Sequence, residues 1–221
     1  MRARSSLLAF LCGALSLAAW SQQYGVYRPW LEVKIRSYQM DFHSKDNEFS
    51  KGLTWNLSDT RGRDTDVTFF MTTEFALEWS LIESRHDFML HDRWGNSSDV
   101  GAIKLRLESF LFQVHYPTEN RIKPYFGVGA NRSTVQTYFS AEDWLYGLDF
   151  SGRGSKWGWV AQLGVDFLLR WNLVFNIDCK YIRNDALLQS VRTSGPSKGR
   201  TYGYDLSLNP TVIGFGIGLR W

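Results

Sequence analysis

Apolar and polar residues alternate with a period of two in several segments of this chain. The final segment, NPTVIGFGIGLRW (209–221), carries apolar side chains on one face and mostly glycine on the other. The segments PWLEVKIRSYQ (29–39), WVAQLGVDFLL (159–169) and NLVFNIDCKYI (172–182) alternate in the same way, with polar or charged residues on the second face. Alternation over about ten residues is the pattern of a β-strand whose two faces meet different surroundings. We therefore predict an all-β fold.

Alternation by itself fits two kinds of β protein. In a soluble sandwich the apolar face points into the core, whereas in a transmembrane barrel it points toward lipid and the polar face lines the lumen. Aromatic residues near strand ends favour the barrel, because such residues form girdles at the membrane interfaces. They are Trp30, Trp157, Trp159, Trp171 and Trp221. Closure into a ring would also protect the edge of the last strand, which otherwise invites aggregation.

The first residues have the pattern of a secretory signal peptide. Two arginines precede the apolar run SLLAFLCGALSLAAW (6–20), and small residues at Ala19 and Ser21 mark a cleavage site. We predict a signal peptide at 1–21 and a single transmembrane barrel domain at 22–221. The chain is expected to be exported.

Composition agrees with a membrane barrel and excludes other classes. Aromatic residues make up 16% of the chain, and no run after residue 21 approaches the roughly 20 apolar residues of a membrane helix. The net charge is only +3, with both signs interspersed, so no nucleic-acid partner is expected. Cys179 is the single cysteine of the mature part, and it lies on an apolar face that we expect to contact lipid.

The connections between the predicted strands alternate between short and long. Short turns are expected near Thr73, at 117–121 and at Arg170. Longer segments rich in Gly, Ser and charge lie at 43–65, 91–99, 137–156 and 190–200. Three turns and four loops define an up-and-down antiparallel barrel of eight strands, with short periplasmic turns and longer extracellular loops. The loop charges are expected to be solvated; they are Lys45, Asp46, Lys51, Arg61, Arg63 and Asp64.

Three stretches carry a resemblance to a known family. They are RIKPYFGVGANRSTV (121–135), SKWGWVAQLGVDFLLRWNLVFNIDCKYI (155–182) and LSLNPTVIGFGIGLRW (206–221). Together they resemble the OmpW family, with a close match over 121–221 and a weaker one over 26–116. The resemblance implies a multi-pass barrel in the bilayer of the cell outer membrane, with a narrow and rather hydrophobic channel. Small hydrophobic molecules are thought to pass sideways through the barrel wall of such proteins.

The resemblance also implies roles for particular residues. The last strand, ending at Trp221, would be the signal that the barrel-assembly machinery recognises. The channel of the family is narrowed by an aromatic residue that falls at Lys180 in this sequence, and its aliphatic partner falls near Ser80. A lysine and a serine at these positions would make the constriction polar.

Strand parity places a set of charged residues on the lumen face. Two interpretations are open: an ion-pair plug that fills the small barrel, or a channel barrier that contacts a ligand. The channel-lining and constriction candidates are Lys180, Asp178, Glu78, Ser80 and Asn176. The lumen ion-pair candidates are Glu32, Lys34, Arg36, Lys104, Arg106, Glu108, Asp166 and Arg220.

Catalysis and metal binding find little support in the sequence. The four histidines are scattered, without the serine and acid partners of a hydrolase or the spacing of a metal site. We expect no enzyme activity, no metal and no cofactor. The preferred function is passage of small, hydrophobic molecules across the outer membrane with lateral exit to the bilayer. The alternative is a surface-exposed barrel with a closed lumen, whose loops bind a host or environmental ligand in an adhesin or receptor role.

Overall fold

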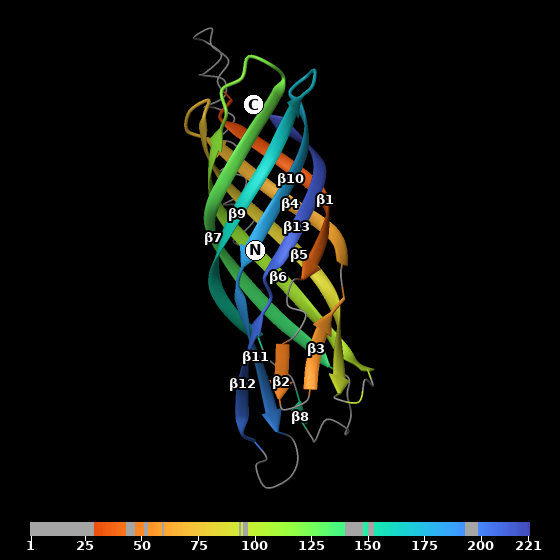
Figure 1. Cartoon of the computed structure of the whole chain (residues 1–221). Helices are drawn as coiled ribbons and strands as arrows, with labels where there is room; N and C mark the ends of the chain where they lie inside the picture. Colours follow the sequence, from red (N-terminus) through yellow and green to blue (C-terminus); the bar gives the residue numbers. More distant parts are fainter. Residues whose placement is uncertain are drawn as a thin grey trace, which may run out of the picture.

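The fold is a closed barrel of β-strands, seen from the side in Figure 1. The computed structural model describes residues 29–42, 47–50, 53–58, 60–92, 94, 97–139, 148–149, 153–192 and 199–221. The predicted signal peptide at 1–21 lies outside the described residues. The described part of the chain contains no helix long and apolar enough to cross a membrane.

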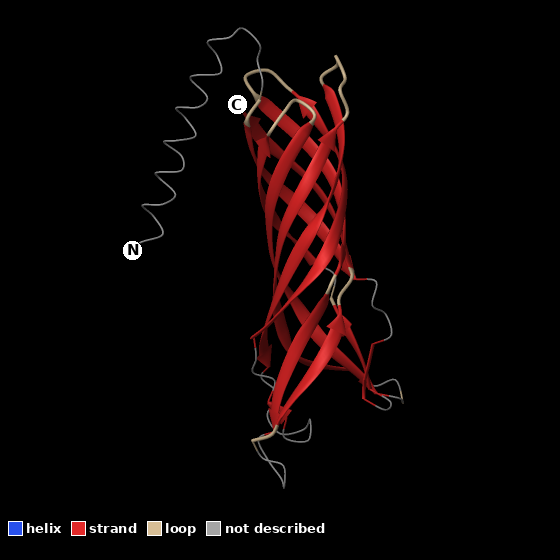
Figure 2. Ribbon diagram, turned by 90° about the vertical axis from the view of Figure 1, so that its left-hand side faces the viewer, coloured by secondary structure: helices blue, strands red, loops and turns tan. Residues whose placement is uncertain are grey.

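Eight antiparallel strands form the wall, which confirms the predicted fold class. They are β1 (Leu31–Phe42), β4 (Thr60–Phe70), β5 (Phe75–Asp92), β6 (Ser97–His115), β7 (Ile122–Phe139), β9 (Arg153–Leu168), β10 (Leu173–Arg183) and β13 (Pro210–Arg220). Each strand pairs with its neighbours along the chain, and β13 pairs with β1 to complete the ring (Figures 1 and 2).

The last strand therefore has no free edge. Its register with β1 runs from Glu32 opposite Arg220 to Phe42 opposite Pro210. The backbone N–H of Trp221 donates a hydrogen bond to the carbonyl of Leu31 at 2.8 Å. Ring closure explains how an apolar strand can end the chain without an exposed edge.

The three short turns lie at one end of the barrel, which we call the turn end (top in Figure 1). They span residues 71–74, 116–121 and 169–172. The third has Trp171 and Asn172 at φ angles of 58° and 64°. Positive φ at both central residues is the mark of a type I′ turn, whose twist matches that of the strands it joins.

The opposite end, called the loop end, carries short strands as well as loops. A hairpin is formed by β2 (Asn47–Ser50) and β3 (Leu53–Leu57), and β3 also pairs with β5. A second hairpin, β11 (Asp185–Arg192) and β12 (Thr201–Ser207), pairs with β8 (Leu148–Asp149) and extends beyond the barrel (Figure 2).

Parts of the predicted loops are strands in the structure. The segment 43–65 contains the start of β4, and the segment 91–99 contains the ends of β5 and β6. These strands are longer than the roughly 9–11 residues needed to cross a bilayer, because several continue past it. Of the charges that predicted the first of these loops, Arg61 and Arg63 lie on the outer face of β4.

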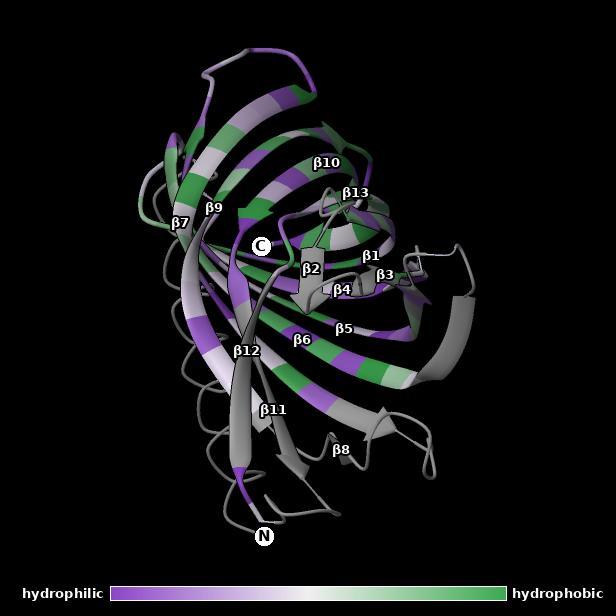
Figure 3. Cartoon of the chain, turned by 60° about the horizontal axis from the view of Figure 1, so that its bottom comes forward, coloured by the Kyte–Doolittle hydropathy of each residue, from purple (hydrophilic) through white to green (hydrophobic). Residues whose placement is uncertain are grey.

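The barrel has two sections in which the inside and the outside exchange character. Toward the turn end of β6, Phe110 and Phe112 point outward and Gln113 points inward. Toward the loop end of the same strand, Leu105 and Leu107 are buried inside the barrel. Figure 3 shows polar and apolar residues alternating along β5, β6 and β7. The first section has the pattern of a membrane barrel, and the second has that of a protein in water.

This exchange corrects part of the predicted lumen set. Lys104, Arg106 and Glu108 lie on the outer face of β6, where they are half-exposed, and not in the lumen. The prediction assumed that polar residues face the lumen along the whole strand. Beyond the membrane that assumption reverses, because water surrounds the barrel and the apolar residues turn inward.

Candidate functional site

The interior of the turn-end section is filled by a network of polar and charged side chains, which we call the plug. Its charged members are Glu32, Lys34, Arg36, Asp64, Asp66, Glu78, Asp166, Asp178, Lys180 and Arg220, and its polar members are Thr68, Ser80, Gln113, Tyr125, Gln162 and Asn176. All of them are buried, and they come from all eight wall strands. The inward positions of these strands alternate with outward apolar residues, so the strand period itself gathers them on the axis.

Lys180 on β10 reaches across the barrel to β4 and β5. Its Nζ donates hydrogen bonds to Ser80 Oγ at 2.5 Å, to Asp64 at 3.0 Å and to Asp66 at 3.1 Å. The carboxylate of Glu78 lies 3.4 Å from the same nitrogen. The ammonium group therefore has a polar partner on each of its three N–H bonds.

Arg36 on β1 binds the neighbouring carboxylates. Its guanidinium lies 2.5 Å from Asp178 and 3.1 Å from Asp64, and it also pairs with Asp66. Its Nη1 donates to the side-chain oxygen of Asn176 at 3.1 Å. A planar guanidinium with five N–H donors suits a site where several carboxylates converge.

A second group of ion pairs lies nearer the turn end. Arg220 pairs with both Glu32 and Asp166, which joins β13 to β1 and β9. Lys34 lies 2.7 Å from Glu32, and its Nζ stands 5.3 Å from the centre of the Tyr125 ring. The cation–π contact adds to the ion pair because both groups are removed from water.

Side-chain amides connect the ion pairs to one another. The amide nitrogen of Gln162 donates to Asp178 at 2.7 Å and to Glu78 at 3.0 Å, and that of Gln113 donates to Glu78 at 2.8 Å. Asn176 donates to Asp166 at 2.7 Å. The plug is thus one continuous network, which is the condition under which buried charges are tolerated.

Two glycines make room for large plug residues. A Cβ at Gly164 would lie 2.3 Å from the Tyr125 ring, and one at Gly216 would lie 2.5 Å from the Arg36 side chain. The glycines of the last strand thus leave lumen space for the side chains of β1.

Beyond the plug, the charged interior gives way to apolar side chains, among which a few uncharged polar residues such as Ser84 and Asn184 are also buried. The next inward residue after Lys180 on β10 is Ile182, and the next after Ser80 on β5 is Ile82. Both belong to a cluster of buried apolar side chains that lies mainly inside the loop-end section, although its member Leu111 pairs with Glu78 at the level of the plug. That cluster, called the apolar section, consists of Tyr38, Met40, Leu57, Ile82, Ile103, Leu105, Leu107, Leu111, Val135, Val160, Ile182, Leu208 and Val212.

The structure brings most of the predicted site residues together. All five constriction candidates, namely Lys180, Asp178, Glu78, Ser80 and Asn176, lie in the plug. So do five of the eight ion-pair candidates, namely Glu32, Lys34, Arg36, Asp166 and Arg220. Their role as a channel constriction remains a prediction.

Several plug residues were missed by the sequence reasoning. Asp64 was expected in a solvated loop, but it is buried on β4 beside Asp66, so that expectation is wrong. The alternation in TRGRDTDVTFF (60–70) is the signal that could have found both. Gln113 and Gln162 were missed because they carry no charge.

The histidines inside the barrel serve local contacts. His86 Nε2 lies 2.8 Å from Ser84 Oγ, and Nδ1 lies 2.8 Å from the backbone carbonyl of Ser58. A backbone carbonyl thus occupies the place that a carboxylate takes in a catalytic triad. Among the described residues, no group of three or more His, Cys, Asp and Glu is placed to hold a metal ion.

The fold and the plug define the class of the protein: an eight-stranded transmembrane β-barrel with a polar interior at membrane level. The chain belongs to the OmpW family, whose sequence model matches residues 33–221. The resemblance noted in the sequence is thereby confirmed. The barrel is accordingly an outer-membrane protein.

Solved structures of outer-membrane proteins share this fold. OprG from Pseudomonas aeruginosa is 17% identical, with a TM-score of 0.75 over 87% of this chain and 96% of that one. The outer-membrane protein AlkL is 18% identical, with a TM-score of 0.58 over 88% and 90%. The E. coli outer membrane protein W is 17% identical, with a TM-score of 0.55 over 87% and 98%. No curated protein sequence matches the chain significantly.

Proposed function

We propose that this barrel lets small apolar molecules cross the outer membrane. They enter the apolar section of the interior from the loop end and leave sideways into the bilayer. The observation that carries the proposal is the boundary between the apolar section and the plug, at Lys180 and Ile182. A second support is membership of the OmpW family, for which such passage is expected.

The plug makes an axial route unfavourable for an apolar molecule. Passage along the axis would separate Lys180 and Arg36 from their carboxylates. Breaking one buried pair costs about 3–5 kcal/mol, and an apolar solute offers the freed charges no hydrogen bond in return. The solute is therefore expected to leave through the barrel wall on the loop-end side of the plug.

Uptake of a small uncharged naphthyl fluorophore by cells that carry the protein tests the proposal. Leu107→Gln places an amide inside the apolar section, and it should reduce the rate toward that of cells with an empty membrane. Leu81→Gln is the matched control. Leu81 pairs with Glu108, the residue next to Leu107 in the chain, so it lies at nearly the same level but on the outward face of β5. That variant should keep the parental rate.

The plug gives a second comparison. If the fluorophore leaves on the loop-end side of the plug, Lys180→Ser should change its rate of uptake little. Because loss of Lys180 also weakens the barrel, uptake is compared only for variant protein that keeps its β-sheet circular dichroism spectrum. A large change in that protein would place the route through the plug and contradict lateral exit. If the parent protein and the empty membrane give the same rate, transport is refuted and the loop-binding alternative is favoured.

The proposed role is transport and not catalysis. His86 is buried in the barrel and is held by a serine and a backbone carbonyl. This arrangement supports a structural role for the histidine.

A further inference from the structure

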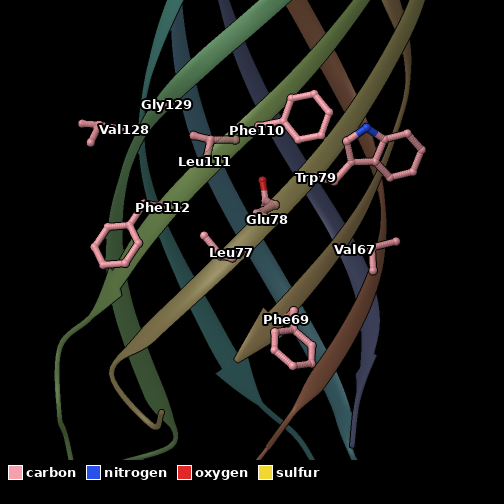
Figure 4. Close-up of a pocket in the computed structure, with 10 residues that line it drawn as sticks. All are labelled: Val67, Phe69, Leu77, Glu78, Trp79, Phe110, Leu111, Phe112, Val128 and Gly129. Carbon is pink, nitrogen blue, oxygen red and sulfur yellow. The ribbon is translucent and has the colours of Figure 1, made fainter. Parts of the chain in front are cut away.

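The outer wall of the barrel carries an apolar groove across four neighbouring strands, β4 to β7. The groove has a volume of about 570 Å³. The side chains that line it include Val67, Leu77, Trp79, Phe110, Phe112 and Val128, which are drawn in Figure 4. Their outward position in the turn-end section places the groove against the hydrocarbon of the bilayer.

Strand register fixes what lies beyond the groove toward the loop end. Trp79 stands opposite Phe110 within the groove. Four residues further along the same two strands, Glu83 stands opposite Arg106. Four residues of strand span about 13 Å, so the polar side chains of Glu83 and Arg106 lie within the length of one lipid molecule from the groove.

A small polar pocket occupies that position. It has a volume of about 90 Å³ and is lined by Glu83, Lys104, Arg106, Thr134 and Gln136. The Lys104 and Arg106 side chains are 43% and 41% exposed, so both remain accessible from outside the barrel. Glu83 lies 3.8 Å from Lys104 and 4.0 Å from Arg106, which is too far for a strong hydrogen bond.

Cations predominate in the rows of residues around this pocket. Glu83 stands between Arg63 and Arg106 on the neighbouring strands, and Glu108 stands opposite Arg132. Arg106 donates to Glu108 at 2.6 Å, so one carboxylate is already engaged. With Lys104, four cations face two carboxylates in this patch, which therefore has a net positive charge.

We infer that this face binds a phosphorylated lipid of the outer leaflet. One acyl chain would lie in the groove, and the phosphate would contact Lys104 and Arg106, with Arg132 beside them. The groove alone would suit any lipid and the cations alone would suit a free anion. The cationic patch lies on the loop-end side of the apolar groove, on a wall that faces the bilayer. This arrangement fits a lipid with an apolar chain and an anionic headgroup. The inference is independent of the proposed transport.

Retention of lipid by the purified full-length mature protein tests the inference. The probe is diphosphorylated lipid A, added to protein in an uncharged detergent, and bound lipid is counted by native mass spectrometry. The reference ligand is the same glycolipid without its phosphates. The parent protein should retain the phosphorylated form in clear preference.

Two pairs of variants separate the headgroup from the acyl chain. Arg106→Gln should weaken retention about tenfold, because a charge-assisted contact with phosphate is lost. Its control is Arg183→Gln, an exposed cation beyond the apolar belt on β10, which should have no effect. Val128→Trp should also weaken retention by filling the groove. Its control is Ile217→Trp, at an exposed belt position on β13.

Each other outcome overturns the inference. Equal retention of the two glycolipids, or an equal loss in Arg106→Gln and Arg183→Gln, would mean general charge attraction. Release of the lipid by millimolar inorganic phosphate would indicate a site for free anions. If Val128→Trp alters the oligomeric state in analytical ultracentrifugation and leaves lipid retention unchanged, the groove is an interface with a second copy. All four substitutions point outward, and retention of the β-sheet circular dichroism spectrum checks that each variant folds.

Discussion

Lys180 on β10 donates a hydrogen bond of 2.5 Å to the hydroxyl of Ser80 on β5, across the inside of the barrel. The two residues are 100 positions apart in the chain. They mark the level at which the charged plug ends and the apolar section begins. The same lysine nitrogen contacts Asp64 and Asp66, so this bond belongs to the most highly connected part of the network.

Lys180→Met is expected to destabilise the barrel strongly. The substitution removes one of the two cations that contact both Asp64 and Asp66, and it leaves Arg36 as the other cation beside these two buried carboxylates. The expected loss is about 3–5 kcal/mol in the free energy of unfolding. Urea titration in lipid bilayers measures it, with Arg183→Met on the outer face as the control. Equal midpoints for the two variants would show that the lysine is not needed to balance the plug.

The contact between Gly164 and Tyr125 gives a test of packing inside the plug. Gly164→Ala puts a methyl group into the buried tyrosine ring and should cost about 1–3 kcal/mol. Adding Tyr125→Val removes the ring, so the double variant should lose little more than Tyr125→Val alone. A double-mutant cycle in urea measures the coupling. Strict additivity would mean that the ring moves aside freely.

The belt of outward apolar residues should respond to charge according to its depth. Leu163 is an exposed apolar residue of β9 that faces the bilayer, and Leu163→Lys should cost about 2–4 kcal/mol. Gln39 is exposed on β1 beyond the belt, and Gln39→Lys should stay within about 0.5 kcal/mol of the parent. The comparison is made by urea unfolding in bilayers. Similar costs at the two sites would contradict the position assigned to the membrane.

In the absence of a solute, the side chains of the apolar section should pack against one another, so that an entering molecule has to displace them. Leu107→Ala leaves a cavity inside the barrel and is expected to cost about 2–5 kcal/mol. Leu163→Ala faces lipid, which fills the vacated space, so its cost should lack the cavity contribution. The free energies of unfolding of both variants, measured under the same conditions, test this difference. A larger loss at Leu163 would refute close packing around Leu107.

Much of the architecture could be predicted from the alternation of side chains. The strand order, the eight-strand count and the closure at Trp221 follow from a period of two interrupted by turns and loops. The meeting of Lys180 with Ser80 could be anticipated only through the family resemblance, because no local pattern relates positions so far apart.

Other features could not be read from the pattern alone. Asp64 was assigned to a loop because glycine and charge surround it, although it alternates with Arg63 on a strand. Lys104 and Arg106 were assigned to the lumen because the membrane boundary is not marked in the sequence of β6. Where that boundary is unknown, the same polar position can face either the lumen or water.

The exchange of polar and apolar faces along the barrel means that the same strands are surrounded by lipid in the turn-end section and by water in the loop-end section. The loop-end section already presents charge to water around an apolar interior, as at Leu105 and Arg106. The turn-end section differs in its apolar outer belt and in its interior, where the plug residues bind one another. Polar residues in place of belt positions such as Ile35 and Phe215 would therefore give a route to a water-soluble form of this barrel, with its interior network left as it is.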